Sequence, residues 1–344
     1  MGNSSVLNEF LYWTLAYCAS LANKVCKFPW GVAYLNAENP THHQSNQAHV
    51  LVPLAKCVVK DSVSSSPTLT SVLADITTLY SSHGIVPRVI IYPELQPLEK
   101  NKGEEKLSLS LRTAHQAWRN SQQASESLSI LQYDPRDTTR ATRPDAEQYR
   151  GVSTFADSEA IVRKAHMDDL DEASHVVKAA FGYDQIDDTA WIRPKLEKQL
   201  DHPDKFDIYV MTWGCRTTGE KANPSLNTSY QPSRRGPGVQ EVDHSQYREH
   251  KVVGIAVVFH PPEKEPVWPS CSISTPVHLV QMIAIHPDYQ KRGLGTLLLR
   301  TLCQKTPSHT KLYIETTSSD SKRLYTQCGF KEVGVVDSVE FWLD

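Results

Sequence analysis

The sequence lacks the glycine-rich loops that hold nucleotide phosphates in the commonest nucleotide-binding folds. It has no GxxxxGK[ST] segment and no strand-to-helix turn with three glycines at dinucleotide spacing. Its seven cysteines form an odd set without a CxxC pair, which argues against a disulfide framework and against a zinc knuckle. A reducing compartment, the cytoplasm or the nucleus, is therefore expected.

Positive charge is also not in excess. Lysine and arginine total 36 against 39 aspartate and glutamate, a formal net charge of −3, so no overall basic field attracts a nucleic acid. The most apolar early segment, residues 6–26, is interrupted by Glu9 and Asn23 and lacks the charged start of a signal peptide. It is predicted to be a buried helix, and no membrane partner is expected.

The length of 344 residues predicts two domains. In the first half, apolar periodicity predicts a helix over residues 6–22, and alternating or continuous apolar runs predict short strands. Residues 135–152 contain two prolines and no apolar periodicity, which is typical of a linker. We therefore expect a domain over 1–135, a linker over 136–152 and a second domain over 153–344.

The second half reads as strands first and then strand and helix in alternation, which predicts an α+β fold with a mixed sheet. Residues 215–250 are rich in asparagine, serine, proline and glycine, and are expected to form a long mobile insertion. Near the end, a strand predicted within residues 277–285 leads through a glycine-containing turn directly into a helix with a leucine stripe.

That turn has the properties of an anion site. The first amides of a helix have no partner within the helix, and the helix dipole adds partial positive charge there. Gly293 and Gly295 allow the backbone to approach a ligand closely, and Lys291 and Arg292 add positive charge. The turn therefore predicts a site for a diphosphate.

Two motifs resemble those of the GNAT superfamily of acyl-coenzyme A dependent N-acetyltransferases. The first is the Q/R-x-x-G-x-G/A turn, here residues 290–295, and the second places Tyr325 four residues before Gly329 and Phe330. The resemblance covers the chain from about residue 160 to its end. It implies a central, mixed, twisted sheet flanked by helices, with acetyl-CoA bound in a V-shaped split between strands. The first half resembles, more weakly, the degenerate GNAT-like domain of two-domain relatives and would shape the substrate cleft.

The resemblance also implies residue roles. The diphosphate would bind the amides of residues 291–296, the pantetheine arm would pair with residues 283–285, and Tyr325 would protonate the departing thiolate. Ser318 occupies a position where many relatives have an asparagine. The cofactor-binding set expected on these grounds is Ile283, Ala284, Ile285, Gln290, Lys291, Arg292, Gly293, Leu294, Gly295, Thr296, Ser318 and Tyr325.

The general base is left open by the sequence. Leu279 and Gln281 occupy the strand positions where relatives can hold a catalytic histidine or glutamate, and neither is a base. Gln281 would hold a relay water, and His278, His286 and Glu315 are alternative bases. The catalytic set expected from the sequence is Tyr325, Gln281 and His278.

The leading hypothesis is direct transfer of an acetyl group from acetyl-CoA to a small-molecule amine in a ternary complex, without a metal. His42, His43 and His49 lack a carboxylate or cysteine at metal-binding spacing. Acetylation of a protein lysine or N-terminus is one alternative, and a non-catalytic acyl-CoA-binding scaffold is another. The acceptor's identity and the oligomeric state cannot be deduced from the sequence.

Overall fold

The protein is described here from a computed structural model covering residues 3–52, 67–92, 95, 99–101, 104–106, 124–136, 158–183, 190–216, 247–262 and 276–342. Residues 137–152 of the expected linker and 217–246 of the expected insertion lie outside these ranges. The strands on either side of the expected insertion run to Arg216 and begin again at Tyr247.

The first half begins with the helix expected from the apolar periodicity. This helix, α1, is buried along most of its length, with Trp13 and Leu15 fully inaccessible. The strand pattern was predicted less completely, because the solvent-exposed strand β1 has no clear apolar alternation. The elements are α1 (Asn3–Leu21), β1 (Lys24–Phe28), β2 (Gly31–Leu35), the 3-10 turn η1 (His43–Ser45), β3 (Gln47–Val50), α2 (Leu69–Ser81), β4 (Arg88–Ile91), the β5–β6 hairpin (Glu99–Asn101 and Glu104–Lys106) and β7 (Ala124–Tyr133).

The second half follows the predicted order closely. Local signals define its helix ends: α4 stops at Gly182, whose φ of 72° is in the left-handed region that glycine favours. The elements are β8 (Ser158–Lys164), η3 (Met167–Asp169), α4 (Leu170–Phe181), α5 (Ile192–Leu200), β9 (Phe206–Arg216), β10 (Tyr247–Phe259), β11 (Val277–Ile285), η6 (Pro287–Tyr289), α6 (Leu294–Lys305), β12 (Lys311–Thr316), α7 (Ser319–Gln327) and β13 (Lys331–Trp342).

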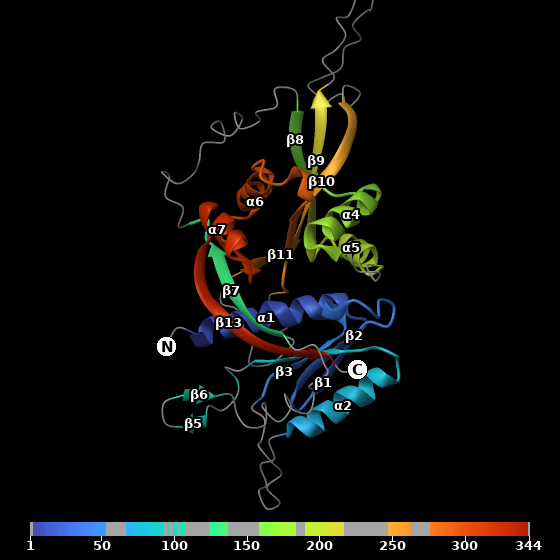
Figure 1. Ribbon diagram of the computed structural model, residues 1–344, viewed down its shortest axis with the longest axis vertical. Coiled ribbons are helices and arrows are strands. Elements are labelled where there is room, and N and C mark those ends of the chain that lie inside the picture. The colour runs from blue at the N-terminus through green and yellow to red at the C-terminus, as the bar shows by residue number, and fades with distance from the viewer. Residues whose placement is uncertain are drawn as a thin grey trace, which may run out of the picture.

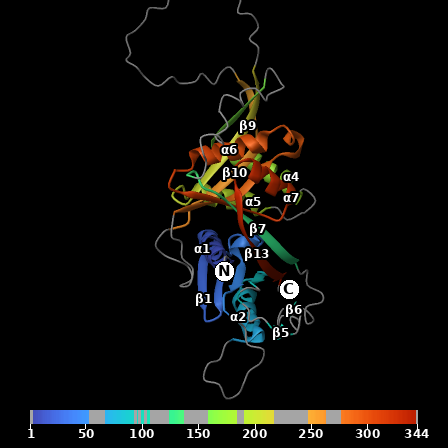
Figure 2. The same cartoon turned by 90° about the vertical axis from the view of Figure 1, so that its left-hand side faces the viewer.

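One sheet of eleven strands runs through both halves, in the order β1-β2-β3-β4-β13-β7-β12-β11-β10-β9-β8. The halves exchange strands: β7 lies between β12 and β13, and the end of β13 pairs with β4. In Figures 1 and 2, β7 and the long β13 pass between the upper and lower parts of the molecule. The predicted units 1–135 and 153–344 stay a prediction, but they do not have separate sheets.

Helices cover both faces of the second half's sheet (Figure 1). Residues of α6 and α7 pack with one face in a core that includes Leu298, Ile314 and Tyr325. Residues of α4, α5 and the first-half helix α1 pack with the other face, around Leu279 and Tyr313. A further core lies under α2 in the first half. None of the helices in the described ranges is long and apolar enough to cross a bilayer.

Candidate active site

The predicted turn connects β11 to α6 and leaves the start of that helix open. Gly293 takes a φ of 79° immediately before the helix, and Lys291 takes a φ of 59°, which is uncommon for a residue with a side chain. Among the described residues, no side chain caps α6. Its first amides are therefore free to bind an anion from outside the helix.

Side chains of the turn hold its shape. The amide nitrogen Nε2 of Gln290 donates to the Ile285 carbonyl at 2.9 Å, which ties the turn to the end of β11. Nη2 of Arg292 donates to the Asp288 carbonyl at 2.9 Å, and its guanidinium lies 5.4 Å from the centre of the Tyr289 ring. The predicted cofactor contact of Gln290 stays a prediction, but its side chain has a structural partner.

The sheet splits next to this turn. Strands β11 and β12 pair in parallel from Val277 with Lys311 to Val280 with Ile314, and no pairing between them continues beyond that point in residues 276–342, all of which are described. On its other side, β11 stays paired with β10 as far as Ile285. The strand edge that contains Ile283 and Ala284 therefore borders the opening between β11 and β12, as the sequence predicted.

Gln281 lies at the base of the split. The register between β10 and β11 shifts at this residue, because Val257 pairs with Met282 and Val258 with Val280. Gln281 is thus the extra residue of a β-bulge, a feature that redirects a strand and its side chains. By continuation of the β11–β12 register, Glu315 is the residue of β12 across from it.

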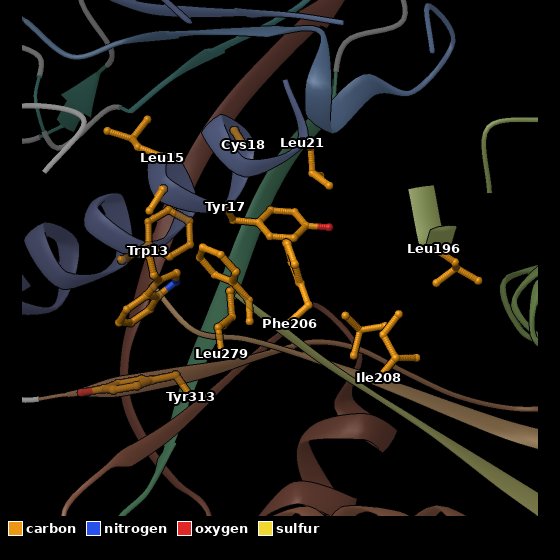
Figure 3. Close-up of a cluster of buried hydrophobic side chains, with 14 of the residues drawn as sticks. Trp13, Leu15, Tyr17, Cys18, Leu21, Leu196, Phe206, Ile208, Leu279 and Tyr313 are labelled. Atoms are coloured by element: carbon orange, nitrogen blue, oxygen red, sulfur yellow. The ribbon is translucent and has the colours of Figure 1, made fainter. Parts of the chain in front are cut away.

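Glu315 faces α1 of the first half. The Trp13 indole nitrogen donates to its Oε1 at 3.1 Å, and the Trp13 ring lies 4.5 Å from that of Tyr313, two residues earlier on the same strand. Figure 3 shows Trp13 extending from α1 toward Tyr313, and Tyr17 lying next to Phe206. Burial raises the pKa of Glu315 to about 7, while the indole bond opposes that rise.

Tyr325 lies on the opposite face of the sheet, in α7. It is buried together with Ile285 from the end of β11, Leu294 and Leu298 from α6, and Ile314 from β12. Burial raises the pKa of its phenol. The split is therefore flanked by a carboxyl group on one face and a phenol on the other.

The other predicted residues are more distant from the split or have structural roles. His278 lies in the paired part of β11, stacks on His260 with ring centres 4.0 Å apart, and has a pKa lowered to about 4, chiefly by burial. His286 accepts a bond from the Asp288 amide at the start of η6. Ser318 caps α7 by accepting a hydrogen bond from the amide of Ser321.

A polar cluster beside Gln281 was missed from the sequence. Gln281 Nε2 donates to Gln44 Oε1 at 3.4 Å, and Lys195 Nζ donates to the same oxygen at 2.8 Å. Tyr17 donates to it at 3.3 Å. These residues come from η1, α5 and α1, so no local spacing in the sequence could have indicated that they meet at the bulge.

An uncapped helix start lies beside a split between two parallel strands of an α+β sheet, an arrangement that suits an anionic ligand extended along a strand edge. The family model of the acetyltransferase (GNAT) family matches residues 224–330, a range that includes the turn, both strands of the split and Tyr325. Over this range the chain is therefore similar to the GNAT family, which supports the resemblance of its two motifs.

Solved structures resemble the fold at low identity. A functionally unknown conserved protein from Staphylococcus epidermidis has a TM-score of 0.50 at 12% identity, with 93% of each chain covered. A GCN5-related N-acetyltransferase from Kribbella flavida has a TM-score of 0.49 at 12% identity, covering 96% of this chain and 94% of its own. A tandem GNAT protein from the clavulanic acid biosynthesis pathway has a TM-score of 0.42 at 12% identity, covering 98% and 95%. No curated protein sequence matches the chain significantly.

Proposed function

We propose that the protein transfers an acetyl group from acetyl-CoA to the amine of a small molecule, by direct attack within a ternary complex. The family supports an acyl-CoA co-substrate and N-acetyl transfer. The observation that carries the proposal is the meeting of two features at the end of β11, the uncapped start of α6 and the split from β12.

The residues present fit the cofactor. The amides from Lys291 to Thr296 would hold the diphosphate, with the αL conformation of Gly293 leaving open space where a side chain would stand. The unpaired edge of β11 from Ile283 to Ile285 would pair with the amides of the pantetheine arm, as an added strand does. When bound, the cofactor supplies the thioester carbonyl that the amine attacks.

Glu315 is the best-placed base. An alkyl ammonium has a pKa near 10.4, so its deprotonation at neutral pH costs about 4 to 5 kcal/mol and needs a proton acceptor. With a pKa of about 7, Glu315 is substantially ionised at neutral pH and is still basic enough to take a proton. Trp13 fixes the orientation of its carboxylate through the indole bond.

Tyr325 is proposed as the acid. As the nitrogen attacks, the C–N bond forms and the C–S bond breaks, the amine proton passes to Glu315, and the leaving thiolate takes the phenol proton. The two groups lie on opposite faces of the split, so they would flank a thioester held between the strands. This arrangement separates proton removal from proton delivery.

A small acceptor is favoured over a protein substrate. Helix α1 packs on the Glu315 face of the sheet, and Trp13 and Tyr17 are almost completely buried there. A folded protein surface would have to displace this helix to deliver a lysine to Glu315.

Calorimetry with acetyl-CoA and a thiol-release assay over a panel of small amines test the proposal. Cofactor binding with amine-dependent thiol release is the expected result. Binding without any amine-dependent release would instead support an acyl-CoA-binding scaffold.

A further inference from the structure

A pocket of about 350 Å³ lies between α5 and the first half of the chain. We call it the seam pocket. Its walls include His42 and Glu38 from the segment before β3, and Lys195, Glu197 and Asp201 from α5 and its end. It is therefore a feature of how the two halves pack, and neither half forms it alone.

The inner end of the seam pocket adjoins the split. Lys195, a wall residue that is 6% exposed, donates from Nζ to Gln44 Oε1 at 2.8 Å. Gln281, the bulge residue across from Glu315, donates to that same oxygen at 3.4 Å. Lys195 and Gln44 therefore link a wall of the seam pocket to the base of the split through two hydrogen bonds.

The surroundings of this amide have an excess of hydrogen-bond acceptors. Oε1 of Gln281, Oε1 of Gln199 and Nε2 of His42 are buried without a partner among the described residues. Ser45 Oγ donates to the His42 carbonyl at 3.1 Å, so ring atom Nδ1 acts as the donor in its 2.9 Å bond to that hydroxyl, and Nε2 is left as an acceptor. Unpaired buried acceptors are costly and favour a ligand that donates hydrogen bonds.

The mouth of the seam pocket is acidic. Glu38, Glu197 and Asp201 contribute three carboxylates. Glu197 is paired with Arg193 at 3.0 Å, and Lys198 supplies one ammonium that donates to the Leu21 carbonyl at 2.8 Å, so the carboxylates of Glu38 and Asp201 outnumber the remaining ammonium. Burial lowers the pKa of Lys195 to about 7, so it adds less than a full charge at the inner end at neutral pH. The mouth therefore attracts cations.

We propose that the seam pocket binds the acetyl acceptor, and that this acceptor is a small molecule with at least two amino groups. One ammonium is held by the carboxylates of the mouth, and the other amine reaches past Gln44 toward Gln281 and Glu315. This inference rests on the proposed function, and it adds the route of entry and the class of the acceptor. The volume of the pocket suits a compact diamine and excludes a folded partner.

The test compares 1,4-diaminobutane with butylamine, which lacks the second amino group. We expect a KM at least 10-fold lower for the diamine. Asp201→Asn and Glu38→Gln should each raise the diamine KM about 5-fold, with kcat and the KM of acetyl-CoA unchanged. Asp204→Asn is the matched control, because Asp204 is exposed in the same turn and is not a wall residue of the pocket; it should change nothing.

Glu38→Trp, at an exposed position, fills the mouth without altering the core. It should abolish diamine binding in calorimetry while acetyl-CoA binding persists. Suppose that the wild type binds the diamine but releases no thiol, and that Glu38→Trp does not bind the diamine. This result would support the pocket and contradict the proposed function. If all three pocket variants release thiol in response to amines as the wild type does, the seam pocket does not bind the acceptor. The proposed function would still stand.

Discussion

Each half of the molecule contains a strand, a helix and a parallel strand, and the two units differ where a ligand would bind. In the first half, β3 pairs with β4 at all four of its positions, and Thr68 caps α2 by accepting the amide of Ser71 at 3.2 Å. In the second half, the β11–β12 pairing stops at Val280 and α6 has no side-chain cap. The first unit thus has a capped helix and a continuous pair of strands, whereas the second has an uncapped helix start and a split.

The comparison assigns the halves different roles. The strand–helix–strand unit of the first half has a capped helix start, and the first half contributes side chains to the second, with Trp13 against Glu315 and Gln44 against Gln281. The second half supplies the open turn and the split. The variants below alter the second half and, where the chain offers one, a matched control position.

The largest effect is expected at the turn. Gly293→Asp places a carboxylate beside the helix start that would hold the diphosphate, and it forces a side chain into the left-handed region. We expect the affinity for acetyl-CoA to fall at least 100-fold in calorimetry. Gly84→Asp is the control, because Gly84 follows α2 with a φ of 63° and equally open surroundings, and it should leave the affinity unchanged. Equal losses in both variants would point to misfolding.

Removing the phenol hydroxyl of Tyr325 in α7 should lower turnover. Tyr325→Phe keeps the packing in the core but removes the proton donor, so kcat should drop on the order of 100-fold with little change in the dissociation constant of acetyl-CoA. Tyr80→Phe in α2 removes a buried hydroxyl that donates to the Tyr34 carbonyl at 2.5 Å. That variant should lose about 1 kcal/mol of stability and retain kcat. An unchanged kcat in Tyr325→Phe would show that Tyr325 only packs in the core.

The pH dependence of kcat/KM should reveal whether Glu315 acts as the base. Glu315 must be deprotonated to accept a proton, and its folded-state pKa is about 7, so kcat/KM should rise with pH through neutrality and level off above it. Glu315→Gln should lower kcat about 10- to 100-fold and remove this limb of the profile. If Glu315→Gln keeps both the wild-type kcat and the rise of kcat/KM through neutral pH, another group accepts the proton.

A further effect is expected on stability at the seam and not on activity. Burial lowers the pKa of Lys195 from 10.5 to about 7, so the unfolded chain binds more protons between these values. The free energy of unfolding of the wild type should therefore rise as pH increases from 7 to about 10. Lys195→Met should remove this dependence and stabilise the protein at pH 7 by roughly 2 to 4 kcal/mol. Lys198→Met, on the same helix and less buried, should change stability far less.

Local spacing in the sequence encodes both motifs of the candidate site. Gly293 and Gly295 lie within one turn, and Tyr325 lies at a fixed distance from Gly329, so both motifs could be recognised without knowing the fold. The buried helix α1 was also predicted, because its apolar residues recur along a single segment. The split itself was inferred from the family resemblance, and the register of β11 and β12 agrees with it.

Contacts between distant segments could not be predicted in this way. β7 pairs with β13 across about two hundred residues, and β13 pairs with β4, because strand pairing depends on backbone geometry that apolar periodicity does not record. The same limit applies to Trp13 and Glu315, and to Gln44 and Lys195. His278 was selected from the sequence for its chemistry and its strand, but the structure places it in the paired part of β11.

Hydrogen exchange at the two helix starts tests the central contrast most directly. Addition of acetyl-CoA should slow amide exchange from Lys291 to Thr296 by at least 10-fold and leave the first turn of α2, from Leu69 to Val72, unchanged. Unaltered exchange at residues 291–296 with saturating cofactor would show that the open start of α6 does not bind it.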